Sequence, residues 1–405
     1  MTAESTEQHS NLGLGDESSI WFNLSPLLKD PENPMRLLMQ MAERYGPVIP
    51  VNMANQRVVL VTDPEYFKHV LVTKVDNYVK YFDGLKPIFG KSMITHDGAL
   101  WQKIRMPQQP AFHPDAFGDY IPYFIEAIKT KMANWGELAK TGETFEMVEQ
   151  TWTLAVFKCV KTYTDVSNHK DIRLKRQADA LFEVGEEDTA KAVEAWWSVP
   201  PAVFAADPRE EREKTLLKMI EAAVADPNIP EFDRQQAVDE IKQYLWAGTE
   251  TTALTLAWAM YLTSTHPEAA ERIRREGEAV CGDREPTPAD YSALQYTRSV
   301  IQETMRLYPP VWSLIRVATE PDVIAGKEIN PGDRIVLFGY GAHHNPKFWK
   351  DPEAFMPERW MDKTQKQVKY SYIPFGAGKR SCIGGAMSQV ENTLALSILL
   401  RRFRP

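Results

Sequence analysis

A cysteine in a glycine-rich stretch is the feature of this sequence that most directly indicates chemistry. The stretch reads Phe-Gly-Ala-Gly-Lys-Arg-Ser-Cys-Ile-Gly from Phe375 to Gly384, and it contains Cys382. A thiolate is a strong, soft ligand for iron, and it needs hydrogen-bond donors and limited access of solvent to persist. The glycines let the backbone turn tightly and approach a flat partner closely. These residues therefore indicate a cradle for a metal-bound thiolate.

Two other interpretations of the same stretch follow from its residues alone. A lone cysteine is often a small, buried, apolar side chain without any chemistry. The Gly-x-Gly-Lys run also resembles a phosphate-binding loop, but that motif requires glycine at Ile373 and serine or threonine at Arg380. The phosphate interpretation therefore fails at two positions, whereas the buried-cysteine interpretation stays open.

A second set of candidate residues lies in a long helical pattern over residues 235–266, which ends before a proline. Residues 247–252 of this pattern read Ala-Gly-Thr-Glu-Thr-Thr, although glycine in a helix costs about 1 kcal/mol relative to alanine. Glycine lets a helix approach a large flat ligand, and a threonine hydroxyl can bond back to a carbonyl and open a groove. A kinked core helix would show the same pattern. Helical spacing places four of these residues on one face: Tyr244, Ala247, Gly248 and Thr251.

Two further pairs have the spacing of neighbours on a helix. Trp101 and Arg105 are four residues apart, and an indole N–H and a guanidinium on one face can hold a carboxylate. Glu303 and Arg306 are three residues apart, which is the spacing of an ion pair. Taken alone, both pairs are also typical of solvated side chains on a helix surface. A fifth residue, Arg359, lies in the run Pro-Glu-Arg-Trp downstream.

Helices must position most of these residues, because strand patterns occupy only short parts of the chain. We expect a helix at residues 34–45, a β-hairpin at 47–61, and a helix starting at Asp63-Pro64. Residues 115–235 are mainly helical in pattern, and an apolar helix follows the cysteine at residues 386–400. Strands at 317–340 should complete the small sheet. The sequence thus predicts a mainly α fold with a small β-rich subregion.

The composition is that of an ordinary globular protein. The chain has 405 residues, of which 43% are hydrophobic and 25% charged, and its net charge of −8 gives no electrostatic case for nucleic acid. The three cysteines argue against a disulfide framework and fit a reducing compartment. Residues 1–20 are polar without the features of a signal peptide, and no apolar run reaches the roughly 18 residues of a membrane span. We expect a cytoplasmic monomer with a flexible tail at residues 1–20.

The pattern Phe375-x-x-Gly378-x-Arg380-x-Cys382-x-Gly384 resembles the haem-binding loop of the cytochrome P450 superfamily, the haem-thiolate monooxygenases. The other segments occur in the order that this family shows. The resemblance implies the cytochrome P450 fold, with a single haem-thiolate domain at residues 21–405, although family members usually continue further beyond the cysteine. It also implies that the cofactor is haem b, with Cys382 as the ligand of its iron.

The resemblance also assigns roles to the other candidates. The acid and alcohol of the distal helix would be Glu250, which relays protons, and Thr251, which holds ordered water. Glu303, Arg306 and Arg359 would form a buried structural network. Further haem contacts would come from Trp101, Arg105, Ala247, Gly248, Arg316, Phe375, Gly378, Arg380 and Gly384. The substrate pocket would include Phe82, Leu85, Phe89, Tyr244, Val311, Trp312 and Leu314.

The implied reaction inserts one atom of O2 into a C–H bond of a hydrophobic small molecule, by hydroxylation or epoxidation. Electrons from NAD(P)H would arrive through a ferredoxin or flavodoxin, because the sequence shows no flavin or iron–sulfur motif. Basic residues could form the docking face for this acidic donor: Lys103, Lys379, Arg401 and Arg402. Two alternatives are an H2O2-driven peroxygenase and a non-catalytic haem sensor or electron carrier. Glu250 and Thr251 argue against both alternatives, because peroxygenases of this family tend to replace the acid–alcohol pair and a sensor or carrier needs no distal proton relay.

Two motifs are left without a firm role. The apolar run at Trp196-Trp197 could belong to the core, to a lid or to a surface that touches a membrane, and we favour core or lid. The pair His343-His344 could indicate a metal site, but no third ligand lies at a recognised spacing. We therefore expect these histidines to have structural roles.

Overall fold

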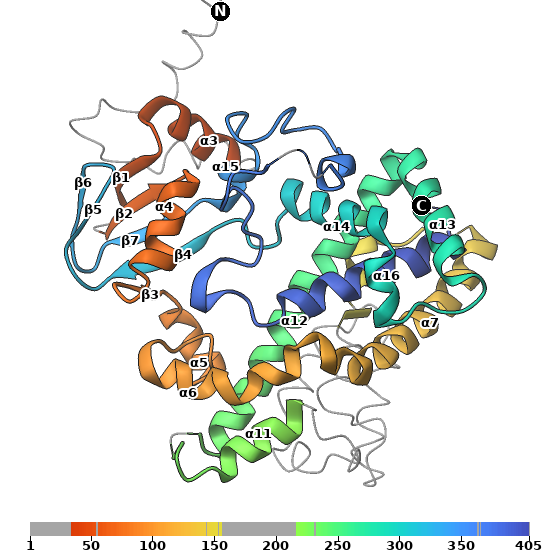
Figure 1. Cartoon of the computed structure of the whole chain (residues 1–405), viewed down its shortest axis with the longest axis horizontal. Coiled ribbons are helices and arrows are strands. Elements are labelled where there is room, and N and C mark those ends of the chain that lie inside the picture. Colours follow the sequence, from red (N-terminus) through yellow and green to blue (C-terminus); the bar gives the residue numbers. More distant parts are fainter. Residues whose placement is uncertain are drawn as a thin grey trace, which may run out of the picture. The chain divides into compact units, whose positions relative to one another are not determined.

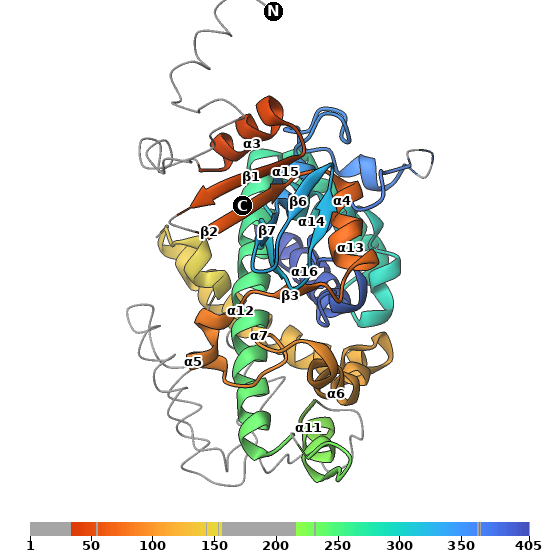
Figure 2. The same cartoon turned by 90° about the vertical axis from the view of Figure 1, so that its left-hand side faces the viewer.

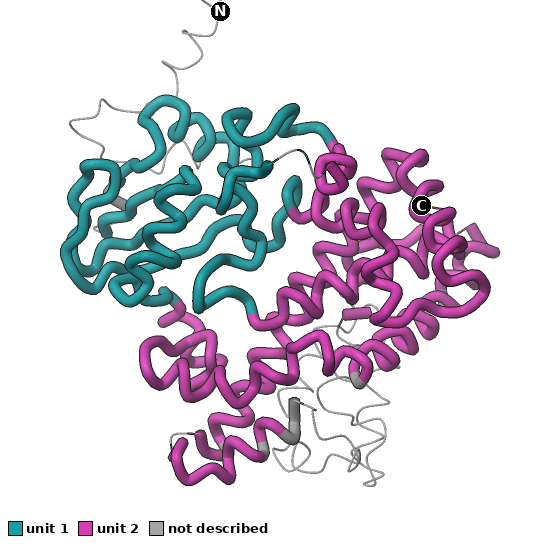
Figure 3. Tube along the Cα trace, in the orientation of Figure 1, with its two compact units in different colours: residues 1–81, 306–354, 364–382 teal, residues 82–305, 355–363, 383–405 magenta. Residues whose placement is uncertain are grey.

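The computed structural model describes residues 34–53, 56–142, 144–152, 154–155, 216–230, 232–362, 364 and 366–404. The chain divides into two compact units (Figure 3). Unit 1 comprises residues 1–81, 306–354 and 364–382, and unit 2 comprises residues 82–305, 355–363 and 383–405. Both the predicted tail and the pair Trp196-Trp197 lie outside the described residues.

Unit 1 is built on a five-stranded mixed sheet with the order β1-β2-β7-β4-β3 (Figures 1 and 2). β1 and β2 form the predicted hairpin, β2 pairs in parallel with β7, and β4 is antiparallel to both β7 and β3. A separate two-stranded sheet joins β5 and β6. The strands are β1 (Val48–Met53), β2 (Gln56–Val61), β3 (Tyr78–Lys80), β4 (Leu314–Ala318), β5 (Asp322–Ile324), β6 (Lys327–Ile329) and β7 (Arg334–Leu337).

Apolar side chains from helices cover this sheet. α3 packs on β1 and α15, and its Leu37 and Met41 join Ile49, Leu60 and Phe338 in one buried cluster. The Asp63 carboxylate begins α4 by accepting the N–H of Glu65 (3.0 Å), as an N-cap residue does. The helices of the unit are α3 (Pro34–Tyr45), α4 (Pro64–Lys68), the π-helical turn η1 (His69–Thr73), α15 (Gly339–His343) and the 3-10 turn η10 (Gly378–Arg380).

The described part of unit 2 is helical. The core helix α16 contacts α7, α12 and α13, and nearly every residue from Met387 to Leu400 is buried. α12 is its longest described helix, with Asp233 as the N-cap and His266 as the C-cap. The helices are α5 (Lys86–Phe89), α6 (Gly98–Gln108), α7 (Phe117–Thr141), α11 (Leu216–Ala225), α12 (Arg234–Thr265), α13 (Pro267–Cys281), α14 (Gln295–Leu307, which continues into unit 1 at Arg306) and α16 (Gly385–Arg402). The 3-10 turns are η2 (Asp83–Leu85), η3 (Gln109–Phe112), η4 (Pro114–Ala116), η8 (Pro288–Ser292) and η9 (Pro357–Trp360).

The prediction of a mainly α fold with a small β-rich subregion is confirmed, with two differences in the strands. Residues 322–329 form their own small sheet and do not complete the larger one. β3 was not expected, because a strand of three residues is too short to show a sequence period. No helix within the described ranges has the length and apolar character needed to cross a membrane.

Candidate functional site

The cysteine stretch of unit 1 forms a closed loop. The Cys382 N–H donates to the carbonyl of Phe375 (2.9 Å), and the Ser381 N–H donates to that of Gly378 (3.1 Å). Gly378 has a φ of +70°, and a Cβ at this position would lie 2.3 Å from the carbonyl oxygen of Leu71. The backbones of the loop and of η1 thus touch at a point where only glycine fits.

Side chains fasten the same loop to residues 75–78. The Arg380 Nη1 donates to the carbonyls of Tyr78 (2.7 Å) and Val75 (3.3 Å). The Lys379 ammonium binds the exposed Asp76 carboxylate, and this hydrogen bond lowers the pKa of Asp76. The loop therefore has little freedom to move relative to its own unit.

Cys382 is exposed at the end of this braced loop. The described residues include two reduced cysteines, and the other one, Cys281, is buried in unit 2, where desolvation raises the pKa of its thiol. A thiolate that is accessible and held by a fixed backbone can bind a soft metal ion, whereas a buried thiol in apolar surroundings is inert. The donor chemistry of Cys382 thus fits a haem iron. Cys159 lies outside the described residues.

Three of the predicted pocket residues lie in unit 1, just before and within β4. Val311 and Trp312 keep 44% and 41% of their surface exposed, which is unusual for such large apolar side chains. The Leu314 side chain approaches the loop, since its Cδ1 would be 3.4 Å from a Cβ at Gly376. Arg316 is buried in the same strand, with Nη1 donating to the carbonyl of Ile315 (2.8 Å). An apolar surface with a cation nearby suits a flat hydrophobic group that carries carboxylates.

α6 of unit 2 carries Trp101 and Arg105. Trp101 is buried, and the Arg105 guanidinium carbon lies 5.4 Å from the centre of its ring. The two side chains are therefore neighbours on one helix face, as their spacing predicts. The haem-carboxylate role of this pair stays a prediction.

α12 carries the predicted acid and alcohol. The Thr251 Oγ1 donates to the carbonyl of Ala247 (2.7 Å), and the Thr255 Oγ1 donates to that of Thr251 (2.8 Å). These back-bonds bend a helix and free one side of it for other contacts. Ala247, Gly248, Glu250 and Thr251 are all half-buried, in a helix whose neighbouring positions are mostly buried.

The other predicted pocket residues also lie in unit 2. Phe89 is buried, and its ring centre is 5.2 Å from that of Trp246, whereas Phe82 and Leu85 are half-buried. Tyr244 is buried, and its hydroxyl donates to Gln108 Oε1 (2.9 Å). Sequence reasoning missed Trp246, although it directly precedes Ala247.

The predicted structural residues are all buried. Glu303 accepts hydrogen bonds from the Arg359 Nε (3.0 Å), the Trp360 Nε1 (2.8 Å) and the Met356 N–H (3.0 Å), all within unit 2. In unit 1, Arg306 donates to three backbone carbonyls, those of His343 (2.9 Å), Pro352 (2.6 Å) and Ala354 (3.1 Å). Their burial is at odds with the alternative of a solvated surface pair.

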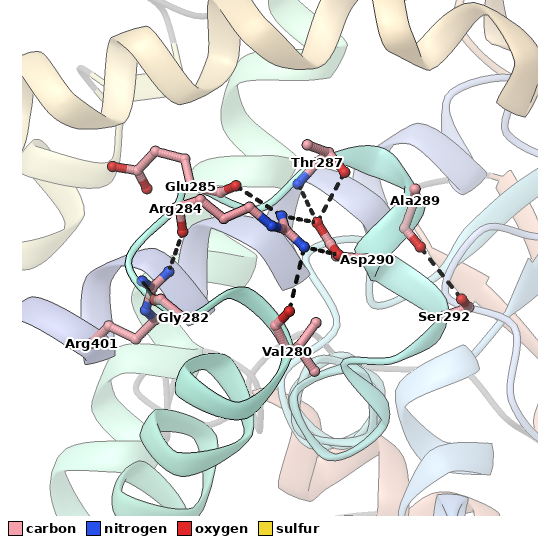
Figure 4. Close-up of polar contacts among 9 residues, drawn as sticks. All are labelled: Val280, Gly282, Arg284, Glu285, Thr287, Ala289, Asp290, Ser292 and Arg401. Carbon is pink, nitrogen blue, oxygen red and sulfur yellow. Dashed lines mark hydrogen bonds and ion pairs between the residues drawn. The ribbon is translucent and has the colours of Figure 1, made fainter.

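Two of the four predicted docking residues are engaged in structural bonds. The Arg401 guanidinium donates to the carbonyls of Arg284 (3.1 Å) and Gly282 (2.5 Å), beyond the end of α13 (Figure 4). Beside it, Arg284 binds the Asp290 carboxylate with both of its terminal nitrogens (2.7 Å each). Lys379 binds Asp76, as described above. Lys103 and Arg402 are exposed.

The two adjacent histidines have structural contacts in unit 1. The buried His343 accepts the Ile373 N–H at Nε2 (3.1 Å). Burial, with smaller contributions from the neighbouring His344 and Arg306, lowers the pKa of His343 to about 3, so its ring is neutral. His344 bonds the Glu353 carboxylate through Nδ1 (2.9 Å) and the carbonyl of Leu307 through Nε2 (3.0 Å). Within the described ranges, no group of three or more metal-ligating side chains gathers at these histidines or elsewhere.

Sequence reasoning also missed a buried polar network in the first half of α12. Asp239, Glu240 and Gln243 accept hydrogen bonds from the backbone N–H groups of residues 91, 93 and 94, respectively. Glu240 is also bonded to Gln108 of α6 (3.3 Å). A signal was present, because Gln236, Glu240 and Gln243 follow the i, i+4, i+7 spacing of one helix face. Such a face looks solvated until its partners are known.

Comparison with known proteins adds independent findings. A family model described as Cytochrome P450 matches residues 15–201 and 202–405. The protein LUTEIN DEFICIENT 5, chloroplastic, from Arabidopsis thaliana is 29% identical over 401 residues, which span 89% of this chain and 67% of that protein. Cyclooctat-9-en-7-ol 5-monooxygenase and cyclooctatin synthase, both from Streptomyces melanosporofaciens, are 27% and 28% identical, and each match spans 89% of this chain and 83% of the relative.

Proposed function

Because the chain belongs to the cytochrome P450 family of haem-dependent monooxygenases, we propose that it inserts one atom of O2 into a C–H bond of a hydrophobic small molecule. Hydroxylation or epoxidation would be the outcome. The observation that carries this proposal is the braced, glycine-rich loop that exposes Cys382. The family supplies haem as the cofactor and O2 as the second substrate, with reducing equivalents from a partner protein.

The cofactor of this proposal is haem b, with the Cys382 thiolate as the ligand of its iron. Its carboxylates would be held by Trp101, Arg105, Arg316 and Arg380. The haem ring would also contact four small residues and one flat aromatic side chain: Ala247, Gly248, Gly378, Gly384 and Phe375. When bound, the haem supplies the redox chemistry of O2 activation, and the thiolate favours cleavage of the O–O bond.

Glu250 and Thr251 would deliver the protons that this chemistry consumes. The Thr251 hydroxyl donates its own proton to the Ala247 carbonyl, so its lone pairs are available to accept a hydrogen bond from water. Glu250 is half-buried on the same helix and can exchange protons with solvent. The pair would therefore act as a relay, with Thr251 orienting water and Glu250 supplying protons.

The substrate would be mainly hydrocarbon, such as a fatty acid, terpenoid, steroid or carotenoid. The candidate pocket residues are aromatic or aliphatic, and such walls orient a C–H bond without hydrogen bonds. They are Phe82, Leu85, Phe89, Tyr244, Val311, Trp312 and Leu314. The name of one relative, cyclooctat-9-en-7-ol 5-monooxygenase, supports a mainly hydrocarbon substrate.

Electrons from NAD(P)H would arrive through an acidic ferredoxin or flavodoxin. Of the basic residues considered, the exposed Lys103 and Arg402 are the better candidates for its docking. Arg401 is a poor candidate, because its guanidinium is bonded to backbone carbonyls.

Replacement of Cys382 tests this function directly. We expect Cys382→Ser to abolish the red-shifted Soret band of the ferrous carbon monoxide complex, because that band requires a thiolate ligand. Cys281→Ser is the matched control, since it removes the buried thiol of unit 2 and should leave the band in place. Persistence of the band in Cys382→Ser would refute the assignment of the ligand.

Replacement of Thr251 tests the proton relay and separates the monooxygenase from a peroxygenase. We expect Thr251→Ala to keep the carbon monoxide band but to divert electrons from product to H2O2, because water is no longer oriented. Thr255→Ala, which removes the next back-bond along α12, should change this coupling much less. The measurement is the ratio of product to NAD(P)H consumed, with a surrogate reductase. An unchanged ratio in Thr251→Ala would contradict the relay.

A further inference from the structure

Residues 90–95 of unit 2 lie between α5 and α6 and are held by side chains of α12. The Lys91 N–H donates to Asp239 Oδ2 (3.0 Å), the Met93 N–H to Glu240 Oε1 (2.5 Å), and the Ile94 N–H to Gln243 Oε1. In the opposite direction, Gln236 Nε2 donates to the Lys91 carbonyl (2.6 Å). A segment outside regular helices and strands cannot satisfy all its backbone groups internally, so these side chains replace a ladder of backbone bonds.

Glu240 is the centre of this arrangement. Its side chain is fully buried, and its Oε1 accepts from Gln236 Nε2 (2.9 Å) as well as from the Met93 N–H. Its Oε2 accepts from the Gln108 Nε2 (3.3 Å), and the Gln243 Nε2 is also in contact (3.5 Å). A buried carboxylate is costly unless several donors surround it, so its position fixes the positions of all these donors.

The network continues from Glu240 to α6 and to the middle of α12. Gln108 bridges Glu240 and the Tyr244 hydroxyl, and its own amide also donates to the Ile104 carbonyl (2.7 Å). Tyr244 is one turn before Gly248 on α12. A continuous chain of hydrogen bonds therefore joins residues 90–95, α6 and the part of α12 that leads to Glu250 and Thr251.

Gly90 provides an independent sign that the segment is pressed against α12. Its φ is +51°, and a Cβ at this position would lie 2.0 Å from Asp239 Oδ2. The backbone of the segment thus approaches the carboxylate to a distance that only glycine permits. A segment that merely rested on the helix would not require this.

We propose that Asp239, Glu240 and Gln243, which we call the loop clamp, are positioning residues that set the shape of the substrate roof, the segment of residues 78–100 that contains the candidate pocket residues Phe82, Leu85 and Phe89. This inference rests on the proposed function, because it takes residues 78–100 to border the substrate. Gln243 lies four residues before Ala247, which is about 6 Å along the helix axis. The clamp therefore fixes Met93 and Ile94 close to the helix segment at which oxygen chemistry would occur. A shift of about 1 Å in such a wall changes which C–H bond is presented.

Hydrogen exchange of backbone amides tests the clamp without any substrate. We expect Gln243→Ala to speed exchange of the Ile94 amide and its neighbours by roughly tenfold or more, because one buried acceptor is lost. Glu240→Gln keeps the size of the side chain but replaces one acceptor oxygen by an NH2 group, which cannot accept hydrogen bonds from the surrounding donors. We therefore expect it to speed exchange at residues 91–94. Gln150→Leu is the control: it removes the buried acceptor of Trp135 Nε1 (2.9 Å) elsewhere in unit 2 and should not change exchange at 91–94.

Two azoles of different size then test the effect on the roof. Under the proposed function, imidazole would bind the haem iron without touching the roof, whereas the phenyl ring of the larger 4-phenylimidazole would contact it. We expect Gln243→Ala to change the dissociation constant of 4-phenylimidazole roughly tenfold, read from the shift of the Soret band, and to leave that of imidazole unchanged. Gln150→Leu should change neither constant.

The outcomes separate the clamp from the function on which it rests. Unchanged exchange at residues 91–94 in both clamp variants would overturn the clamp, whatever the protein catalyses. Faster exchange with equal changes for both azoles, or with none, would overturn its role in shaping the roof. Failure of the wild-type protein to take up haem would instead overturn the proposed function, and the exchange data would still decide whether the clamp holds the segment.

Discussion

In unit 1, side chains hold the segments described above mainly by bonding backbone carbonyls. In unit 2, they do so mainly by bonding backbone N–H groups. In unit 1, Arg380 and Arg306 donate to backbone carbonyls, five of them in total when the bonds to Val75, Tyr78, His343, Pro352 and Ala354 are taken together. In unit 2, carboxylates accept backbone N–H groups: Asp239 and Glu240 bind residues 91 and 93, and Glu303 binds residue 356. At these segments unit 1 uses cations and unit 2 uses anions, although Asp63 of unit 1 also accepts a backbone N–H and Arg401 of unit 2 also donates to backbone carbonyls.

The difference has a physical consequence. A guanidinium carries five donors in a fixed fork and never loses its charge, so one arginine can order several turns at any pH. A buried carboxylate is stable only while hydrogen bonds and ion pairs compensate for its loss of hydration. When one partner is removed, the protein is destabilised by the part of that desolvation energy that is no longer compensated. We therefore expect unit 2 to be more sensitive to single replacements at its anions, and unit 1 to be more sensitive to steric changes in its backbone.

The largest effect should come from Glu303 of unit 2. Glu303→Ala leaves the buried Arg359 guanidinium, the Trp360 indole and the Met356 N–H without their common acceptor. We expect a loss of about 3–5 kcal/mol in the free energy of unfolding, as for other broken buried ion pairs. Urea unfolding followed by tryptophan fluorescence measures it.

The control is a nearby pair that is exposed. Glu358 binds Arg272 (2.7 Å), with side-chain exposures of 57% and 46%, so Glu358→Ala should cost less than about 1 kcal/mol. Equal losses of unfolding free energy in Glu303→Ala and Glu358→Ala would show that the burial of Glu303 is not what makes it stabilising. The expectation that unit 2 is especially sensitive at its buried anions would then be wrong.

The same contrast explains which parts of the site could be predicted from the sequence. The loop around Cys382 is contiguous, with its glycines and Arg380 at fixed short spacings, so its pattern indicates a thiolate cradle without any knowledge of contacts. α12 was predicted within a residue at each end, because its helical pattern is long and Pro267 follows it, and the structure adds Asp233 as its N-cap. Local signals were sufficient in both cases.

The partners of Glu240 could not be predicted in this way. Its donors come from residues 93, 108, 236 and 243, and nothing in the sequence near residue 93 marks its N–H as needing an acceptor. The parallel pairing of β2 with β7 was hidden for the same reason, since the two strands are far apart along the chain. Long-range pairing depends on packing, and periodicity within a single segment carries no information about it.

Steric change in unit 1 should have the next largest effect. Gly378 and Gly376 both have left-handed backbones, but a Cβ at Gly378 would meet the Leu71 carbonyl at 2.3 Å, whereas a Cβ at Gly376 would meet only the end of the Leu314 side chain at 3.4 Å. We expect Gly376→Ala to cost about 1–2 kcal/mol from the left-handed conformation alone. Gly378→Ala should cost at least about 3 kcal/mol, because the backbone of the loop or of η1 must also move.

Haem content and unfolding free energy measure this pair of variants together. Gly378→Ala should reduce the fraction of protein that shows the thiolate carbon monoxide band, since displacement of residue 378 moves Cys382. Gly376→Ala should retain most of that fraction. If the two variants were equally impaired, the contact between the loop and η1 would not be what fixes the sulfur.

The smallest effect should come from His343, a side chain of unit 1 that accepts a backbone N–H. His343 can accept the Ile373 N–H at Nε2 only while its ring is neutral, and its buried Nδ1 has no hydrogen-bond partner among the described residues. The pKa of His343 falls from 6.5 to about 3 in the folded protein, mainly through burial. Between these values the unfolded chain binds the proton and the folded one does not. Stability from this group is therefore complete above pH 6.5 and is lost as the pH falls towards 3.

At pH 5.5, one unit below the ordinary value, the expected loss relative to pH 7.5 is about 1.4 kcal/mol. His343→Gln should remove this part of the pH dependence, because an amide oxygen can accept the same N–H without titrating. Urea unfolding of both proteins at the two pH values measures the difference. Asp and Glu side chains of an unfolded chain are ionised over this range, so a carboxylate cannot produce a slope of this sign. An equal pH dependence of the wild type and His343→Gln would show that protonation of His343 does not cause the loss. The contrast in mild acid between the imidazole of unit 1 and the carboxylates of unit 2 would then be wrong.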